Sequence, residues 1–288
     1  MPAPVSKVPN LRVTQDATAE TARVIPEETP VALVYDGSTH AVMMATPADL
    51  EDFAYGFSLS ERMIARADDV RDLEVAEHAE GLELRMWLKP GLGKLHAERR
   101  RKIAGPTGCG LCGVESLEAA VASPPRVTSD LKVTAADIRE ALASLEPAQV
   151  LNHETRAVHG AGFWSKARGL IALREDVGRH NALDKLIGAV TRADVDPAAG
   201  IVLLTSRVSV EMVQKTAVLG APIIVAVSAP TSLAIRTAEA ANITLVAIAR
   251  RDAFEIFTGG QRIAVPAARE TDATIGATIG NDVHAARC

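Results

Sequence analysis

Two cysteines, Cys109 and Cys112, have two residues between them and lie in a stretch rich in glycine. This spacing suits three kinds of chemistry. A structural zinc site needs four ligands, usually a second C-x-x-C pair or a pair of histidines, and neither accompanies these cysteines in the sequence. A thioredoxin-like redox site lies at a helix start, commonly with proline between the thiols, whereas Gly110 and Leu111 stand here. The third is sulfur relay, in which a thiolate carries the terminal sulfur of a persulfide from donor to acceptor.

A sulfur relay needs an exposed thiol on a loop that reaches two partners. Four glycines within residues 105–113 provide a loop of this kind. The basic run at residues 99–102 would lower the pKa of a nearby thiol, and it is either a solvated surface or a site for an anion. The pair is therefore interpreted as a candidate sulfur carrier, with two incidental reduced cysteines as the alternative.

A second group of polar residues follows a predicted strand and opens a predicted helix at residues 175–181. Ligands of open α/β sheets bind at the carboxyl ends of the strands, so Arg179 and His180 are candidate ligand-binding residues. The structural alternative is that Asp176 or Asn181 caps the helix and Gly178 allows the turn.

Two further loops are predicted at the same edge of the sheet. One contains Arg207 and Ser209, and the other contains Ser228 and Thr231. Hydroxyl groups and free backbone N–H groups at a helix N-terminus bind anions, although Ser209 and Thr231 could simply cap their helices. Three such loops favour a ligand with phosphates. None matches a Walker A or G-x-G-x-x-G pattern, so an ordinary ATP or NAD enzyme is not indicated.

The remaining histidines are less informative. His153 and His159 flank Glu154, but a single histidine is more often a surface or satisfied residue. A zinc deaminase would have H-x-E and then P-C-x-x-C, whereas His153 and Glu154 are adjacent and Gly108 precedes Cys109. The deaminase signature is therefore broken.

The first half of the chain is predicted to form a small α+β unit. Apolar runs at residues 31–35 and 41–46, separated by a turn, predict a hairpin. Residues 47–64 have helical spacing, and two more strands are predicted at residues 73–77 and 82–88.

The second half alternates apolar strands with helical patterns, which is typical of a parallel sheet covered on both faces. The predicted strands are residues 170–173, 201–204, 223–227, 243–248 and 254–257. The predicted helices are residues 134–145, with Thr134 as N-cap, and residues 182–190, 210–219 and 233–241, with a short helix at 115–122. The predicted divisions are a flexible arm at 1–25, an α+β domain at 26–98, the C-x-x-C loop at 99–125, an α/β cofactor-binding domain at 126–260 and a frayed tail at 261–288.

Composition narrows the class of protein. The 288 residues include 31 Lys plus Arg and 36 Asp plus Glu, and a net charge of −5 argues against a nucleic-acid-binding protein. A chain with 48% apolar residues can bury a core. Three cysteines exclude a disulfide scaffold and suit a reducing compartment, and no role is assigned to Cys288. No apolar stretch approaches the roughly 20 residues that cross a bilayer, so we expect a cytoplasmic protein without a membrane segment.

Five segments, in this order, resemble the FdhD family of formate dehydrogenase accessory sulfurtransferases. They are residues 109–113 (CGLCG), 175–185 (EDVGRHNALDK), 207–209 (RVS), 211–215 (EMVQK) and 228–233 (SAPTSL). Residues 44–47 (MATP) and 57–61 (FSLSE) are also similar, and the resemblance spans about residues 27–259.

The resemblance implies a function. Members of this family take sulfur from a cysteine desulfurase of the IscS type and pass it to the molybdenum cofactor before that cofactor enters formate dehydrogenase. The ligand is the bis-molybdopterin guanine dinucleotide form, and no permanent metal is implied. By the family pattern Cys109 is the persulfide carrier, and Cys112 assists by releasing or sharing the sulfur. The family also implies a homodimer and an α/β domain like that of cytidine deaminases, which gives an α/β fold class with a smaller N-terminal α+β domain and a mobile Cys loop.

The family pattern adds a cofactor-binding stretch near the C-terminus: Phe254, Glu255, Ile256, Phe257, Thr258 and Gly259. The chain departs from the family where Phe257 replaces a usual tyrosine, where Ser206 replaces a common glycine, and at Arg156 and Ala157, where a Gly-Gly pair is frequent. Two other functions stay open, namely a chaperone that binds the cofactor without transferring sulfur and a zinc-dependent deaminase-like enzyme.

Overall fold

The structure is a computed structural model, and it describes residues 1–92, 124–193 and 195–265. Cys109, Cys112, Cys288, the basic run at 99–102 and the predicted helix at 115–122 lie outside the described residues. The predictions that concern them therefore rest on the sequence alone.

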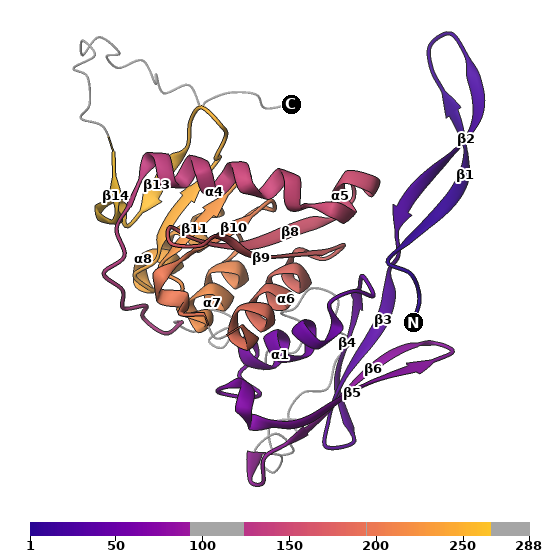
Figure 1. The fold of residues 1–288 in the computed structure, drawn as a ribbon, viewed down its shortest axis with the longest axis horizontal. Coiled ribbons are helices and arrows are strands. Elements are labelled where there is room, and N and C mark those ends of the chain that lie inside the picture. The colour runs from indigo at the N-terminus through magenta and orange to yellow at the C-terminus, as the bar shows by residue number, and fades with distance from the viewer. Residues whose placement is uncertain (93–123, 194, 266–288) are drawn as a thin grey trace, which may run out of the picture.

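The larger part of the molecule is built on a six-stranded sheet with the order β13-β12-β11-β10-β8-β9 (Figure 1). The strands are β8 (His159–Ser165), β9 (Gly169–Asp176), β10 (Ile201–Leu204), β11 (Ile223–Ala226), β12 (Thr244–Ala247) and β13 (Glu255–Thr258). Strands β10, β11 and β12 are parallel, and β8 is antiparallel to both β9 and β10. Consequently β9, β10, β11 and β12 all end at one side of the sheet, which we call the carboxyl edge.

Helices cover both faces of this sheet, as the apolar strands predict (Figure 1). One face packs against α4 (Ala135–Ala148), and the core there includes Ile138, Leu145 and Leu203. The other face packs against α6 (Arg179–Arg192), α7 (Val210–Leu219) and α8 (Ser232–Ala240). Thr134 caps α4 as predicted, because its side chain accepts a hydrogen bond from the Asp137 N–H. A short helix, α5 (Val150–Thr155), follows α4.

The smaller unit is the predicted α+β arrangement. Its sheet has the order β4-β3-β6-β5, formed by β3 (Thr29–Tyr35), β4 (Ser38–Ala45), β5 (Val70–His78) and β6 (Gly81–Leu88). Helix α1 (Leu50–Ser60) packs against one face. The helix is shorter than the predicted 47–64, because Asp49 before it and Arg62 after it have left-handed backbone conformations.

The two units are joined where α1 crosses α6 at two glycines. A Cβ atom on Gly56 would lie 1.6 Å from the carbonyl oxygen of Asp184, and one on Gly188 would lie 1.9 Å from that of Asp52. The two helix backbones are therefore in direct contact. This contact fixes the small unit against the helix that carries Arg179 and His180.

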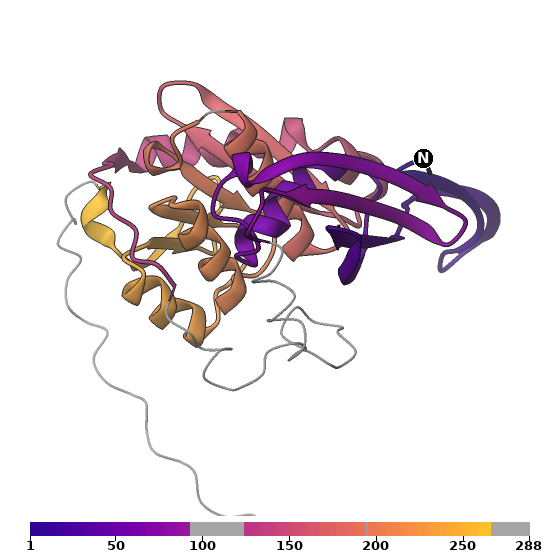
Figure 2. The same ribbon diagram turned by 90° about the horizontal axis from the view of Figure 1, so that it is seen from below.

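The prediction of a loose arm at residues 1–25 is wrong for most of that segment. Strands β1 (Val5–Val13) and β2 (Thr18–Pro26) form an antiparallel hairpin that projects from the body (Figures 1 and 2). Its side chains are mostly exposed, so the sequence lacks the alternation of buried and exposed residues that reveals a strand.

The prediction of a frayed tail is wrong for residues 261–264. Strand β14 (Ile263–Ala264) pairs in parallel with β7 (Val133–Thr134), and Ile263 is buried. The structure also contains the single turns η1 (Ala67–Asp69), η2 (Pro197–Ala199) and η3 (Gly260–Arg262).

Among the described residues, no helix combines the length and the apolar character that crossing a membrane requires. The elements confirm a mixed α/β fold. The likeness to cytidine deaminases stays a prediction, as do the domain boundaries.

Candidate functional site

The loops that follow β10, β11 and β12 are hydrogen-bonded to one another at the carboxyl edge. Val208 forms a parallel bridge with Pro230, and the Thr231 N–H donates to the Val208 carbonyl at 3.0 Å. The Ile248 N–H donates to the Ser228 carbonyl at 3.2 Å. The loops that contain Arg207, Ser209, Ser228 and Thr231 therefore lie side by side, as the sequence predicts.

The loop after β9 is organised around the buried carboxylate of Asp176. This carboxylate accepts hydrogen bonds from the Gly178 N–H at 2.7 Å and the Asn181 amide at 3.0 Å, and its other oxygen lies 2.7 Å from Lys185 Nζ. The small unit contributes the Thr46 N–H, which donates to Asp176 at 3.0 Å. Both units thus fix the turn from which Arg179 and His180 project.

The expected cap of α6 differs from the observed one. Gly178, and neither Asp176 nor Asn181, is the N-cap residue, and its φ of −97° is open to any residue. A Cβ atom at Gly178 would lie 2.9 Å from Asn181 Nδ2, so glycine here makes room for the Asn181 side chain. The turn itself does not require a glycine.

Capping explains one of the two candidate hydroxyl groups. The Thr231 side chain accepts from the Ala234 N–H at 3.2 Å, which is an ordinary N-cap bond. Ser209 is the N-cap residue of α7, but its side chain makes no capping hydrogen bond among the described residues. The Ser209 hydroxyl is therefore available for another partner.

Four buried side-chain atoms at the carboxyl edge have no hydrogen-bond partner within the described part of the chain. They are Arg179 Nε, His180 Nε2, Ser209 Oγ and Glu211 Oε2. All four belong to residues at the start of α6 or α7. Buried polar groups in proteins are almost always paired, so this concentration makes the carboxyl edge a candidate site for a ligand.

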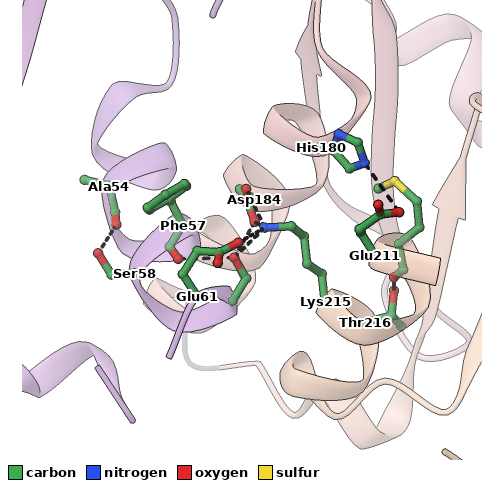
Figure 3. Close-up of polar contacts among 11 residues, drawn as sticks. Ala54, Phe57, Ser58, Glu61, His180, Asp184, Glu211, Lys215 and Thr216 are labelled. Atoms are coloured by element: carbon green, nitrogen blue, oxygen red, sulfur yellow. Dashed lines mark hydrogen bonds and ion pairs between the residues drawn. The ribbon is translucent and has the colours of Figure 1, made fainter. Parts of the chain in front are cut away.

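His180 and Glu211 face each other across the gap between α6 and α7 (Figure 3). His180 Nε2 and Glu211 Oε2 are 3.9 Å apart, which is too long for a hydrogen bond. One turn further along α6, Asp184 binds Lys215 Nζ of α7 at 2.9 Å, and Glu61 of the small unit binds the same ammonium at 3.0 Å (Figure 3). Lys215 is thus already neutralised by two carboxylates.

The electrostatic environment keeps His180 neutral. Burial, with smaller contributions from the charges of Arg179 and Lys215, lowers the pKa of His180 to about 4. Burial alone would lower the pKa of Lys215 as well, but the carboxylates of Asp184 and Glu61 outweigh it and raise that pKa. At neutral pH the site therefore holds a neutral imidazole next to a protonated lysine.

His159, at the start of β8, belongs to the same region. Burial and the nearby charge of Arg179, followed by that of Arg207, lower its pKa. The two arginines and the N-termini of α6, α7 and α8 make the carboxyl edge attractive to anions.

The residues from Phe254 to Gly259 do not all lie at the carboxyl edge. Strand β13 is antiparallel to β12, so Glu255 lies opposite Ala247 at the carboxyl edge, whereas Thr258 lies opposite Leu245 near the other end of β12. Phe254 and Ile256 pack on the α4 side of the sheet, and Phe257 packs on the α6 side.

The last two residues of the stretch have structural partners. The Thr258 hydroxyl donates to the Ile243 carbonyl at 2.7 Å, and the Gly259 carbonyl accepts from the Thr244 hydroxyl at 2.8 Å. Gly259 has a φ of +64°, a conformation that favours glycine. Of the six residues, Phe254 and Glu255 are the ones near the other loops of the carboxyl edge.

Glu211 opens the segment 211–215 that resembles the FdhD family, but the sequence assigns no role to its side chain. A glutamate in the first turn of a helix is common because it interacts favourably with the helix dipole, so its type and position are not distinctive. Only the packing of α6 against α7 shows that its Oε2 atom is buried and has no hydrogen-bond partner among the described residues.

The described residues contain no group of three or more His, Cys, Asp or Glu side chains placed to hold a metal ion. Cys109 and Cys112 lie outside these residues. The deaminase-like alternative needs zinc, so the zinc content of the purified protein tests it.

Comparison with known proteins places this chain in a family. The model of the FdhD/NarQ family matches residues 26–264. The sulfur carrier protein FdhD of Agrobacterium fabrum is 55% identical over 254 residues, which cover 88% of this chain and 93% of that protein. The FdhD of Cupriavidus necator is 50% identical over 240 residues, or 83% of each chain.

A crystal structure supports the same assignment. The protein from Desulfotalea psychrophila, described as a formate dehydrogenase accessory protein, superimposes with a TM-score of 0.70 and 25% identity over 90% of this chain and 99% of that one. Because the family model and these relatives cover nearly all of the described elements, this chain belongs to the FdhD/NarQ family.

Proposed function

We propose that this protein is a sulfurtransferase that serves the maturation of a formate dehydrogenase. Cys109 would receive sulfur from a cysteine desulfurase of the IscS type and deliver it to the molybdenum cofactor in its bis-molybdopterin guanine dinucleotide form. The relatives named as sulfur carriers and as a formate dehydrogenase accessory protein support this assignment. The observation that carries the binding half of the proposal is the set of four buried polar atoms at the carboxyl edge that have no hydrogen-bond partner in the part of the chain that the structure describes.

The sulfur step uses only thiol exchange. The Cys109 thiolate attacks the outer sulfur of the donor persulfide, a new S–S bond forms, and the donor's S–S bond breaks. The desulfurase cysteine leaves as a thiolate, so the exchange needs no external oxidant or reductant. Cys112, three residues further along, would release or share the transferred sulfur.

The carboxyl edge is suited to an anionic ligand with several phosphates. The N-termini of α7 and α8 present partial positive charge, and Arg179 and Arg207 add full charges. The Ser209 hydroxyl can donate to a phosphate oxygen, since it forms no hydrogen bond with any described residue. Phe254 and Glu255 extend the same surface across β13.

Three further properties are carried over from the family as proposals. The protein would act as a homodimer, its partners would be the desulfurase and the formate dehydrogenase, and it would work in the cytoplasm. Light scattering of the purified full chain would give the oligomeric state directly.

The sulfur-carrier role is tested by loading the protein. The full chain is incubated with a cysteine desulfurase and cysteine, and the mass of the cysteine-containing peptides is measured. We expect the mass of one added sulfur on Cys109 in the wild type and its loss in Cys109→Ala. Cys288→Ala is the matched control and should load like the wild type.

Complementation separates transfer from binding alone. In a strain that lacks this protein, the variant Cys109→Ala/Cys112→Ala should fail to restore formate dehydrogenase activity. If that variant restores full activity, the protein is a cofactor chaperone and the sulfurtransferase proposal is wrong. Stoichiometric zinc in the purified wild type would favour the deaminase-like alternative.

A further inference from the structure

The β1–β2 hairpin carries a large share of the apolar side chains that the protein exposes. Among the described residues, five of the ten exposed large hydrophobic side chains belong to this end of the chain: Met1, Val8, Leu11, Val13 and Ile25. The hairpin projects from the body, and its main contact with another element is that between β2 and the short helix α5 (Figures 1 and 2). An isolated two-stranded hairpin is only marginally stable in water, so we expect a partner to cover this one.

The pairing of the two strands separates their side chains into two faces of different character. Residues paired across an antiparallel ladder share a face, and successive pairs alternate between the faces. Seven of the ten residues on one face are apolar, and we call it the apolar face of the hairpin. It consists of Val5, Lys7, Pro9, Leu11 and Val13 of β1 and Thr18, Glu20, Ala22, Val24 and Pro26 of β2. The opposite face is mainly polar and includes the hydrogen bond from the Thr21 hydroxyl to Asn10.

The outer half of the apolar face is the part most open to a partner. Leu11 is 61% exposed and Val13 is 69% exposed, and Ala22 between the strands' ends is exposed as well. Pro9 has no N–H group, so β1 cannot offer a complete row of donors to a further strand at its edge. These features favour a partner that packs on the apolar face over one that extends the hairpin as a third strand.

Two opposite charges stand within the apolar face. Lys7 is paired with Val24, and Glu20 is paired with Leu11. The two charged residues are four positions apart along the ladder, about 13 Å, which is too far for an ion pair within one hairpin. Neither residue forms an ion pair with the rest of the described chain. They lie at equal distances on either side of the central pair, Pro9 and Ala22.

This spacing makes the apolar face complementary to itself. A two-fold axis that crosses the strands at the Pro9–Ala22 pair turns one hairpin antiparallel to the other and places the two apolar faces together. The row of Lys7 then meets the row of the partner's Glu20, and the same contact is repeated on the other side of the axis. A second copy of this chain has the matching spacing automatically, whereas an unrelated protein would need it independently.

We propose that the apolar face of the hairpin binds the same face of a second copy of this chain, with the two hairpins antiparallel. Apolar contacts around Leu11 and Val24 supply the main attraction, and the two Lys7–Glu20 contacts fix the relative position of the hairpins. The proposed function includes a homodimer without saying which surface forms it. This inference rests on that part of the proposed function and assigns the surface.

The apolar contact is tested by sedimentation velocity of the full chain over a range of concentrations. We expect the wild type to dimerise and the variant Leu11→Asp/Val13→Asp to dimerise at least about 100-fold more weakly, as expected for the loss of a central apolar contact. The matched control is Asn10→Asp/Arg12→Asp, which adds no less negative charge to the opposite face of the same strand. This control should dimerise like the wild type. Circular dichroism checks that both variants are folded.

The charge contact is tested by exchanging the signs at low salt. In Lys7→Glu, and separately in Glu20→Lys, like charges meet across the axis, and each protein alone should dimerise about 10-fold more weakly than the wild type. An equimolar mixture of the two variants should restore dimerisation, because each negative side chain of one then meets a positive one of the other. The mixture forms this contact only between chains, so an effect on the fold of one chain would not be restored.

Three results would overturn the proposal: a wild type that stays monomeric, a Leu11→Asp/Val13→Asp protein that dimerises normally, or a mixture that dimerises as weakly as its components. Persulfide loading of Cys109 separates this proposal from the proposed function. A dimer that depends on the hairpin but never loads sulfur would refute the sulfur-carrier role and leave the interface intact. A protein that loads sulfur as a monomer would refute the interface alone.

Discussion

His180 links the candidate site to the stability of the fold. Its imidazole is held between α6 and α7, where burial lowers its pKa from 6.5 to about 4. In the unfolded chain the same imidazole titrates near its ordinary value. Between these two pKa values the unfolded state binds a proton that the folded state does not, so this histidine makes folding less favourable as the pH falls.

The expected size of this effect can be tested with His180→Gln, which removes the titrating group. Between pH 7 and pH 5 the wild type should lose about 2 kcal/mol more stability than the variant, the amount that a shift from 6.5 to about 4 produces over that interval. Urea unfolding at the two pH values, without ligand, measures the difference. His159 and the carboxylates remain in both proteins, so their contributions cancel. Equal losses in the two proteins would show that folded His180 accepts a proton readily.

The sequence could predict part of the candidate site at the scale of single residues. Arg179, His180 and Ser209 follow apolar strands directly, and strand ends meet at one edge of a parallel sheet. The sequence could not show that Thr231 caps its helix whereas the Ser209 hydroxyl does not. A hydroxyl residue before a helix gives the same sequence pattern in both cases. Glu211 needed the structure, since its burial results from how two helices pack.

At the scale of elements, continuous apolar runs were the reliable signal. The strands β10, β11 and β12 and the helices between them lie within a few residues of their predicted positions. Each of these strands is fully buried and, apart from Thr244 of β12, consists of apolar residues, so the pattern is unambiguous.

Strand β8 was missed for a physical reason. It begins His159, Gly160, Ala161, Gly162, which reads as a loop. Close packing favours a small residue at Gly162, because a Cβ atom there would lie 2.9 Å from the Leu145 side chain of α4, which would have to shift. Because α4 packs closely against it, the start of β8 lacks the bulky side chains by which a strand is usually predicted.

The α1–α6 crossing gives a prediction about an element. In an isolated helix Gly→Ala is stabilising by about 1 kcal/mol. At Gly188 we expect the opposite sign, a loss of about 3 kcal/mol, because the new methyl group would meet the Asp52 backbone and force the helices apart. The midpoint of urea unfolding measures this loss. Gly260→Ala is the control, since its Cβ atom would lie 3.7 Å from Ile256, an ordinary contact, and should change stability by less than about 0.5 kcal/mol.

At the scale of the whole molecule, the two units form one continuous structure. A single hydrophobic core runs from Leu33 and Phe53 of the small unit to Leu183 and Ile224 of the large one. A fully buried ion pair, Asp176 with Lys185, binds both the N–H and the carbonyl of Thr46 in the small unit. Two domains are predicted from the sequence because the composition and the types of element change near residue 98. The hydrogen bonds that join the halves connect residues more than 120 positions apart in the chain and leave no local signal.

We therefore expect the two units to unfold together, and the two tryptophans allow this to be measured. Trp87 lies in β6 of the small unit, and Trp164 is buried in β8 of the large one. The variant Trp164→Phe reports on the small unit, and Trp87→Phe reports on the large unit. In each variant the fluorescence and far-ultraviolet circular dichroism transitions in urea should coincide, whatever the substitution does to stability. A fluorescence transition that precedes the dichroism transition in Trp164→Phe would show that the small unit unfolds on its own, and that the buried contacts with α6 do not couple the two halves.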